Sequence, residues 1–193
     1  MGRLSRSESQ AKTREQLLAS AQALFRQEGY AATSVERIAE AAGYSKGAVY
    51  SNFDNKEAIF LEVLERQGRQ SLSTLLDDIA RAAGAAEAVN LLVCWADVQS
   101  RSGSWALVIL EHARAAMADT ASVRRQEEII RANWRQLGNV LRRRFPHLTQ
   151  EGETLGALLH EIAYAPAVTF ISRPTAGELM RVAAESLLLH ETA

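Results

Sequence analysis

The segment Gly43-Tyr44-Ser45-Lys46-Gly47 has residue types and a spacing that two different kinds of site share. It fits the G-x-S-x-G pattern of a hydrolase nucleophile elbow, in which a serine sits on a sharp turn between a strand and a helix. It also fits the turn of a helix-turn-helix motif, in which a glycine reverses the chain between two short helices. The flanking sequence decides between these interpretations.

The residues on either side of this segment predict helices and no strand. Apolar residues recur at helical spacing before it, and Thr33 with Glu36 three residues later predicts a capping box for the preceding helix. Ser45 is a suitable N-cap for the helix that follows. The four histidines are scattered, and no strand framework converges one of them on Ser45. We therefore expect no catalytic residue and no enzyme activity, and favour a helix-turn-helix.

A longer pattern supports this interpretation. The run from Thr33 to Glu57 closely resembles the DNA-binding domain of TetR-family transcriptional regulators, and from Ile38 onward it reads I-A-x-x-A-G-x-S-x-G-x-x-Y-x-x-F-x-x-K-E. Upstream, Leu24-Phe25 and Gly29-Tyr30 resemble the end of that family's first helix. The resemblance implies that a long fourth helix links the DNA reader to a helical domain, which binds a small molecule and dimerises through its last two long helices.

The resemblance also implies roles for individual residues. The recognition helix would present four residues to the major groove, where base edges are read: Lys46, Gly47, Ala48 and Asn52. A second group would hold phosphates, which set the register on DNA: Thr33, Ser34, Ser45, Tyr50 and Lys56. Arg14 and the other basic residues before it would either steer towards phosphate or lie in a solvated tail.

Composition and charge are those of an ordinary globular protein, with 47% hydrophobic residues, 23% charged residues and a net charge of −1 over 193 residues. Residues 1–60 carry eight Lys or Arg against seven Asp or Glu, so the slight positive excess is at the N-terminal end. The N-terminal residues contain no apolar run typical of a signal peptide, and no segment is long and apolar enough to span a membrane. We expect a bacterial cytoplasmic, nucleoid-associated protein, with its one cysteine, Cys94, buried.

Helical periodicity and the scarcity of alternating β-branched residues predict an all-α fold of about nine helices. Residues 1–55 are expected to form a three-helix DNA-binding domain and residues 56–193 a helical bundle for ligand binding and dimerisation. The first helix is predicted from Gln10 to Glu28, with Gly29 as its stop. Later helices are expected near residues 86–101, 104–117, 122–145, 150–171 and 175–189.

The fifth to seventh helices contain aromatic and polar residues that could line an apolar pocket with a few orienting contacts. The predicted ligand-binding residues are Trp95, Gln99, Trp105, His112, Arg114 and Trp134. Ordinary core packing stays open as the alternative for the tryptophans. His160 and Tyr164 share a helix face, but no third ligand accompanies them, so we expect no metal site and no cofactor.

The last two helices are predicted to form a two-fold four-helix interface of a homodimer. The predicted interface residues are Leu155, Leu159, Ile162, Leu179, Val182 and Leu187. Small residues such as Gly156 would allow close approach of the helices. A dimer would place two recognition helices about 34–36 Å apart, which matches successive major grooves of a palindromic operator.

These features together predict a ligand-responsive DNA-binding transcriptional regulator, most simply a repressor that a small-molecule effector releases from its operator. One alternative is a TetR-type activator or a DNA-binding protein that needs no inducer. A second is a helical small-molecule-binding protein or enzyme that does not bind DNA, but the sequence offers no paired carboxylates or metal cluster in its favour.

Overall fold

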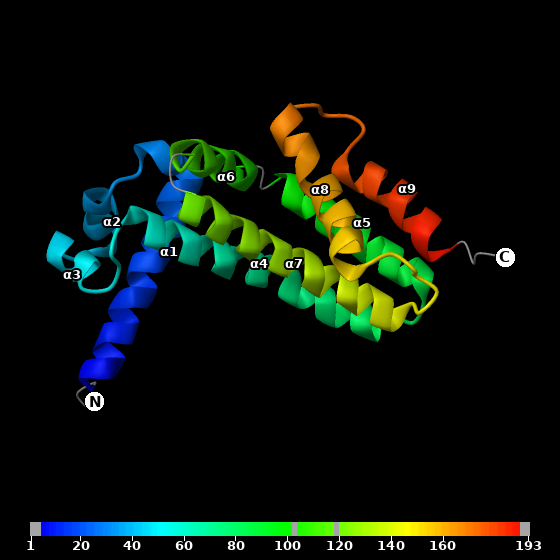
Figure 1. The fold of residues 1–193 in the computed structure, drawn as a ribbon, viewed down its shortest axis with the longest axis horizontal. Helices are drawn as coiled ribbons and strands as arrows, with labels where there is room; N and C mark the ends of the chain where they lie inside the picture. The colour runs from blue at the N-terminus through cyan, green and yellow to red at the C-terminus, as the bar shows by residue number, and fades with distance from the viewer. Residues whose placement is uncertain (1–4, 102–103, 118–119, 190–193) are drawn as a thin grey trace. The chain divides into compact units, whose positions relative to one another are not determined.

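The computed structural model describes residues 5–101, 104–117 and 120–189, and the elements found in these ranges are nine α-helices (Figure 1). The helices are α1 (Arg6–Ala32), α2 (Val35–Ala42), α3 (Lys46–Tyr50), α4 (Lys56–Arg81), α5 (Ala85–Arg101), α6 (Ser104–Ala115), α7 (Thr120–Arg144), α8 (Gly152–Thr169) and α9 (Ala176–Leu188). The prediction of an all-α fold with a helix-turn-helix near the N-terminus is confirmed.

The chain divides into two compact units. Unit 1 comprises residues 1–66 and 107–126, and unit 2 comprises residues 67–106 and 127–193. Helices α4, α6 and α7 therefore run through both units, so the units are not consecutive pieces of chain. A functional boundary at residue 55 stays a prediction, because this division follows contacts and not function.

Unit 1 is organised around α1, whose apolar stripe includes the buried Leu17, Leu24 and Phe25. The helix begins earlier than expected, because Ser5 and Glu8 form a capping box that starts it at Arg6. Gly29 breaks its regular geometry, as predicted, with a φ of 84° and a ψ of 171°, but a short helical turn follows as far as Ala32. Only a residue without a Cβ adopts that conformation readily.

Unit 2 is a helical bundle in which α5 packs against both α8 and α9 (Figure 1). Helices α7 and α8 approach each other through three glycines. A Cβ on Gly138 would lie 1.8 Å from the carbonyl oxygen of Gly152, and a Cβ on Gly156 would lie 1.8 Å from the carbonyl oxygen of Trp134. The backbones of the two helices are thus in direct contact, and no larger side chain fits between them.

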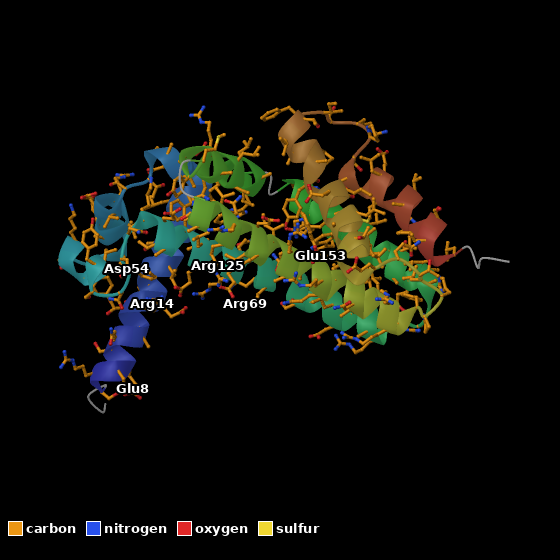
Figure 2. All side chains as sticks on the ribbon, viewed as in Figure 1. Glu8, Arg14, Asp54, Arg69, Arg125 and Glu153 are labelled. Atoms are coloured by element: carbon orange, nitrogen blue, oxygen red, sulfur yellow. The ribbon has the colours of Figure 1, made fainter. Side chains whose placement is uncertain are left out.

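Polar side chains close several helix ends in unit 2. Thr175 and Glu178 form a capping box at the start of α9. Arg144 donates from Nε and Nη2 to the carbonyl oxygen of Ala82, at 3.2 and 2.6 Å, beyond the end of α4. Glu153, labelled in Figure 2, accepts hydrogen bonds from Arg131 and from Arg135 of α7. These bonds tie α7 to α4 and α8 at the surface.

Candidate nucleic-acid interface and effector site

A three-residue turn joins α2 to α3 and fixes how the recognition helix starts. Gly43 has a φ of 74°, and its N–H donates to the carbonyl oxygen of Glu40 at 3.0 Å, while the N–H of Tyr44 donates to that of Ala39 at 2.9 Å. These bonds close the end of α2 in the left-handed conformation that favours glycine. Ser45 then accepts a hydrogen bond from the N–H of Ala48 at 3.2 Å. The predicted turn and N-cap are confirmed.

The N-cap of α2 is Ser34, so the prediction that Thr33 caps this helix is wrong by one residue. Ser34 accepts a hydrogen bond from the N–H of Arg37 at 3.2 Å. Thr33 is almost completely buried, and its hydroxyl donates to the carbonyl oxygen of Gly29 at 2.8 Å. A phosphate contact through Thr33 is therefore inconsistent with the structure, whereas Ser34 stays near the surface at a helix N-terminus.

The outer face of α3 carries the exposed Lys46 and Gly47 and the half-exposed ring of Tyr50, while Val49 is buried. A Cβ on Gly47 would meet only Ser45 Oγ, at 3.7 Å, which is an ordinary contact. Packing within the chain thus gives no reason for a glycine at this position. The absence of a side chain leaves room for another molecule to approach the helix backbone closely.

Lys46 forms an ion pair with Glu36 of α2. The hydrogen bond and the nearby charge of Glu36 raise the pKa of Lys46, and the same bond lowers the pKa of Glu36. Both groups therefore stay charged at neutral pH. Because both side chains are exposed, the pair is easily exchanged for a contact between Lys46 and a phosphate or base edge.

The side chain of Lys56 is bound to backbone groups of its own unit, which the sequence did not predict. Its ammonium donates to the carbonyl oxygens of Tyr30 and Thr33, both at 2.9 Å, and lies 4.1 Å from the centre of the Tyr30 ring. Partial burial lowers the pKa of Lys56, and the charge of Glu111 opposes that shift. Lys56 closes the C-terminal end of α1 and joins it to the start of α4.

The side chains of Asn52 and Arg14 also bind groups within unit 1. The Asn52 side-chain amide donates to the carbonyl oxygen of Ala48 at 2.8 Å, which holds it along α3. Arg14, labelled in Figure 2, donates to the carbonyl oxygen of Asn52 and pairs with Glu62. Its guanidinium lies 4.1 Å from the centre of the Phe53 ring. Lys46, Gly47, Ala48 and Tyr50 remain candidates for DNA contact.

The predicted ligand-binding residues fall into different units. His112 and Arg114 belong to unit 1, where His112 is 0% exposed and Arg114 is exposed at the surface. Trp95, Gln99 and the other two tryptophans belong to unit 2. His112 is thus part of the core of unit 1.

In unit 2 the predicted residues surround a side chain that sequence reasoning did not assign to the pocket. His160 of α8 lies 6.3 Å, between ring centres, from both Trp95 and Trp134, and 4.5 Å from Tyr164. The Tyr164 hydroxyl donates to Gln99 Oε1 at 3.1 Å. Burial raises the pKa of Tyr164, so its hydroxyl stays protonated as a donor. The spacing of His160 and Tyr164, which places both on one helix face, was the feature of the sequence that could have predicted this cluster.

Two buried hydrogen-bond donors in unit 2 have no acceptor among the described residues: the indole N–H groups of Trp105 and Trp134. A buried donor without a partner costs about 1–3 kcal/mol. An acceptor atom on a bound molecule or on water would remove this cost. Trp134 adjoins His160, so one of these donors belongs to the aromatic cluster just described.

A surface groove with a volume of about 440 Å³ lies elsewhere in unit 2. Its lining residues are Leu76 of α4 and, on α7, Ala132, Arg135, Gln136, Asn139, Val140 and Arg143. None of the predicted ligand-binding residues lines this groove. The groove and the aromatic cluster are therefore separate features of the unit.

The predicted dimer residues divide into core and surface. Leu155 and Leu159 are each 1% exposed within their own unit, so their assignment to a surface for a partner is wrong. Ile162 and Leu187 are partly buried, Leu179 is exposed, and Val182 is 71% exposed. Other exposed apolar residues on these helices and beside them are Leu158, Val168, Phe170, Ile171 and Leu189. Gly156 packs against α7 of the same chain, which explains why that face of α8 is buried.

Three further expectations concern the described residues only. Cys94 is exposed, so the expectation of burial from its apolar neighbours in sequence is wrong. No group of three or more His, Cys, Asp or Glu side chains in the described ranges is arranged to hold a metal ion. None of the helices seen in these ranges combines the length and the apolar character that crossing a membrane requires.

The turn, the caps and the helical second unit define a helix-turn-helix protein, and comparison with known proteins gives its family. Residues 17–63 match the model of the family described as bacterial regulatory proteins, tetR family. The chain is 42% identical over 65 residues to the HTH-type transcriptional regulator AcrR of Shigella flexneri, and the match covers 34% of this chain and 30% of that protein. The similarity to this family thus rests on the N-terminal segment, which contains the helix-turn-helix.

Two further comparisons define how far the similarity extends. The chain is 35% identical over 83 residues to the HTH-type transcriptional regulator TtgR of Pseudomonas putida, and the match covers 43% of this chain and 37% of that protein. The chain thus matches about a third of the length of these two relatives. The transcriptional regulator FadR from Bacillus subtilis, solved in complex with stearoyl-CoA, has a TM-score of 0.68 at 18% identity, covering 90% of this chain and 97% of that one. That likeness shows a shared fold.

Proposed function

We propose that this protein is a transcriptional regulator that binds a palindromic operator as a homodimer and is released from it by a small-molecule effector. The observation that carries the proposal is the exposed face of α3, the helix that Ser45 caps. This face carries Lys46, Gly47 and Tyr50. A helix N-terminus favours phosphate, and the adjacent side chains are exposed, so they can reach base edges.

The double variant Lys46→Ala, Tyr50→Ala tests DNA binding directly. Candidate palindromes come from the DNA that flanks the gene, and affinity is measured by fluorescence anisotropy at fixed salt. We expect the variant to lose at least about tenfold in affinity, since base-edge and phosphate contacts are both removed. Arg181→Ala on α9 is the matched control, because it removes one exposed arginine from unit 2. Equal affinities of the double variant and the wild type would overturn the proposal.

The proposed dimer surface consists of the exposed apolar residues of α8 and α9, with Leu158, Leu179 and Val182 at its centre. Exposed apolar residues that recur on neighbouring helices are typical of a protein–protein interface. Val182→Glu places a charge in the middle of this surface and should give a monomer by size exclusion with light scattering. Wild-type protein that is monomeric at micromolar concentration would contradict the homodimer.

The proposed effector site is the aromatic cluster of unit 2, in which Gln99 and Tyr164 supply polar groups beside the rings. All three tryptophans of the chain lie in this unit, so tryptophan fluorescence reports on ligand binding there. Compounds that raise the melting temperature would be tested for a fluorescence change and for release of the operator. A ligand that binds without changing operator affinity would instead favour an activator or an inducer-independent regulator.

A further inference from the structure

His112 of α6 joins three other helices of unit 1 although it lies away from the recognition face. Its ring nitrogen Nδ1 lies 2.5 Å from Oε1 of Gln126 on α7, and Nε2 lies 3.3 Å from Oε1 of Glu57 in the first turn of α4. The ring stacks on Phe60 of α4 with the centres 4.2 Å apart, and it meets the edge of Tyr30 on α1 at 4.9 Å. One completely buried side chain thus contacts α1, α4 and α7.

The neighbouring residue on α6 strengthens this connection to α1. Glu111 accepts a hydrogen bond from the N–H of Ala31 at 3.2 Å, directly after the break at Gly29. A Cβ on Gly29 would lie 2.7 Å from Glu111 Oε2, so the carboxylate packs closely against the break. Lys56, next to Glu57, holds the carbonyl groups at the same end of α1. The end of α1, the start of α4 and the end of α6 therefore form one hydrogen-bonded joint.

This joint lies where a change in geometry would affect the recognition helix. Only five residues separate Tyr50, the last residue of α3, from Lys56, the first residue of α4. Glu57 is therefore close in the chain to the DNA-binding face, while α4 and α7 both continue into unit 2. Buried hydrogen bonds cannot shift by a few ångströms without leaving polar atoms unpaired, so the joint holds these helices at defined angles.

We propose that Glu57, His112 and Gln126 form a positioning triad that determines which spacing of operator half-sites the homodimer accepts. The inference rests on the proposed function, since it requires a dimer that binds a palindrome. None of the three residues is proposed to touch DNA. The triad holds the start of α4, and only five residues connect α3 to α4. The orientation of α3 in each of the two copies then sets the distance between the recognition helices.

The test uses the full chain with His112→Phe, which keeps a flat ring against Phe60 and Tyr30 but removes both hydrogen bonds. The probe DNA is a palindrome recovered from a random library by selection with the wild-type protein. Affinity is then measured for that palindrome, for versions with one or two base pairs added or removed between the half-sites, and for an isolated half-site. Arg114→Ala, an exposed position on the same helix, is the matched control.

We expect His112→Phe to bind the isolated half-site as the wild type does, because the face of α3 is unchanged. Its affinity for the selected palindrome should fall by about tenfold, and its preference for one spacing should flatten or move. A role in stability alone predicts a different result, because unfolding would lower affinity for every probe by the same factor. Glu57→Gln keeps an oxygen acceptor for His112 and should retain the wild-type spacing preference.

Gln126→Leu breaks only the bond to α7 and takes the place of His112→Phe if that variant folds poorly. An unchanged spacing preference in folded His112→Phe or Gln126→Leu would overturn the proposal, as would equal losses on the half-site and on the palindrome. Failure of the proposed function is distinguishable from both, because the wild-type protein would then select no DNA.

Discussion

The α2–α3 turn and the α7–α8 pair show two different ways in which sequence determines structure. Ser34, Gly43 and Ser45 act on backbone groups within four residues of themselves, so their contacts are local. The buried face of α8 is set by Gly138 and Gly156, which meet residues of another helix. Local contacts can be predicted from a short stretch of sequence, whereas the face of a helix that becomes buried depends on its neighbours.

The largest effect is expected at the contact between α7 and α8. Gly156→Val would place side-chain atoms where the carbonyl oxygen of Trp134 lies, so the helices must separate. We expect a loss of more than about 4 kcal/mol in the free energy of unfolding, or no folded protein. Urea unfolding measures the change. Gly84→Ala is the control, because a Cβ there meets no atom within 4 Å; a similar loss in both variants would refute the backbone contact.

The next effect distinguishes core from surface on α8. Leu155→Ala should lower the free energy of unfolding by about 2–5 kcal/mol, because it leaves a cavity in the core of unit 2. The loss should be the same at low and high protein concentration, since Leu155 is buried within its own chain. Thermal unfolding at two concentrations provides the measurement. A loss of stability that appears only at concentrations where the dimer forms would show that Leu155 lies in the dimer interface.

A smaller effect is expected at the start of α4. Lys56→Met keeps the length of the side chain but removes the donor that serves the carbonyl groups of Tyr30 and Thr33. The free energy of unfolding should fall by about 1–3 kcal/mol, because two acceptors lose their partner. The dependence of operator affinity on salt should keep its slope. A decrease in that slope would show that Lys56 contacts phosphate after all.

The smallest effect on stability is expected at Lys46. Lys46 and Lys56 can be compared directly, because the same substitution by methionine should affect stability at one and DNA binding at the other. Lys46→Met should change the free energy of unfolding by less than about 0.5 kcal/mol, because its ion pair with Glu36 is exposed. If Lys46 contacts phosphate, the slope of log affinity against log salt should decrease by about 1. Isothermal binding titrations between 50 and 200 mM salt would measure it. An unchanged slope together with an unchanged affinity would exclude Lys46 from the DNA interface.

The sequence predicted the number and kind of the helices, the turn at Gly43 and the Ser45 cap, because these features depend on periodicity and on local backbone bonds. It did not predict that Lys56 and Asn52 turn inwards, because a long polar side chain can reach either solvent or a backbone carbonyl. His112 was misplaced for a related reason: its partners, Glu57 and Gln126, lie 55 and 14 residues away.

Gly47 leads to a final consequence for how this protein tolerates change. A glycine within a helix costs about 0.5–1 kcal/mol relative to alanine, and the chain has room for a methyl group at this position. In a library of all substitutions at Gly47, sorting cells by yield of folded protein should therefore enrich alanine. Sorting the same library by control of a reporter gene should return glycine. The difference between the two enrichments would separate what the fold requires at this residue from what DNA binding requires.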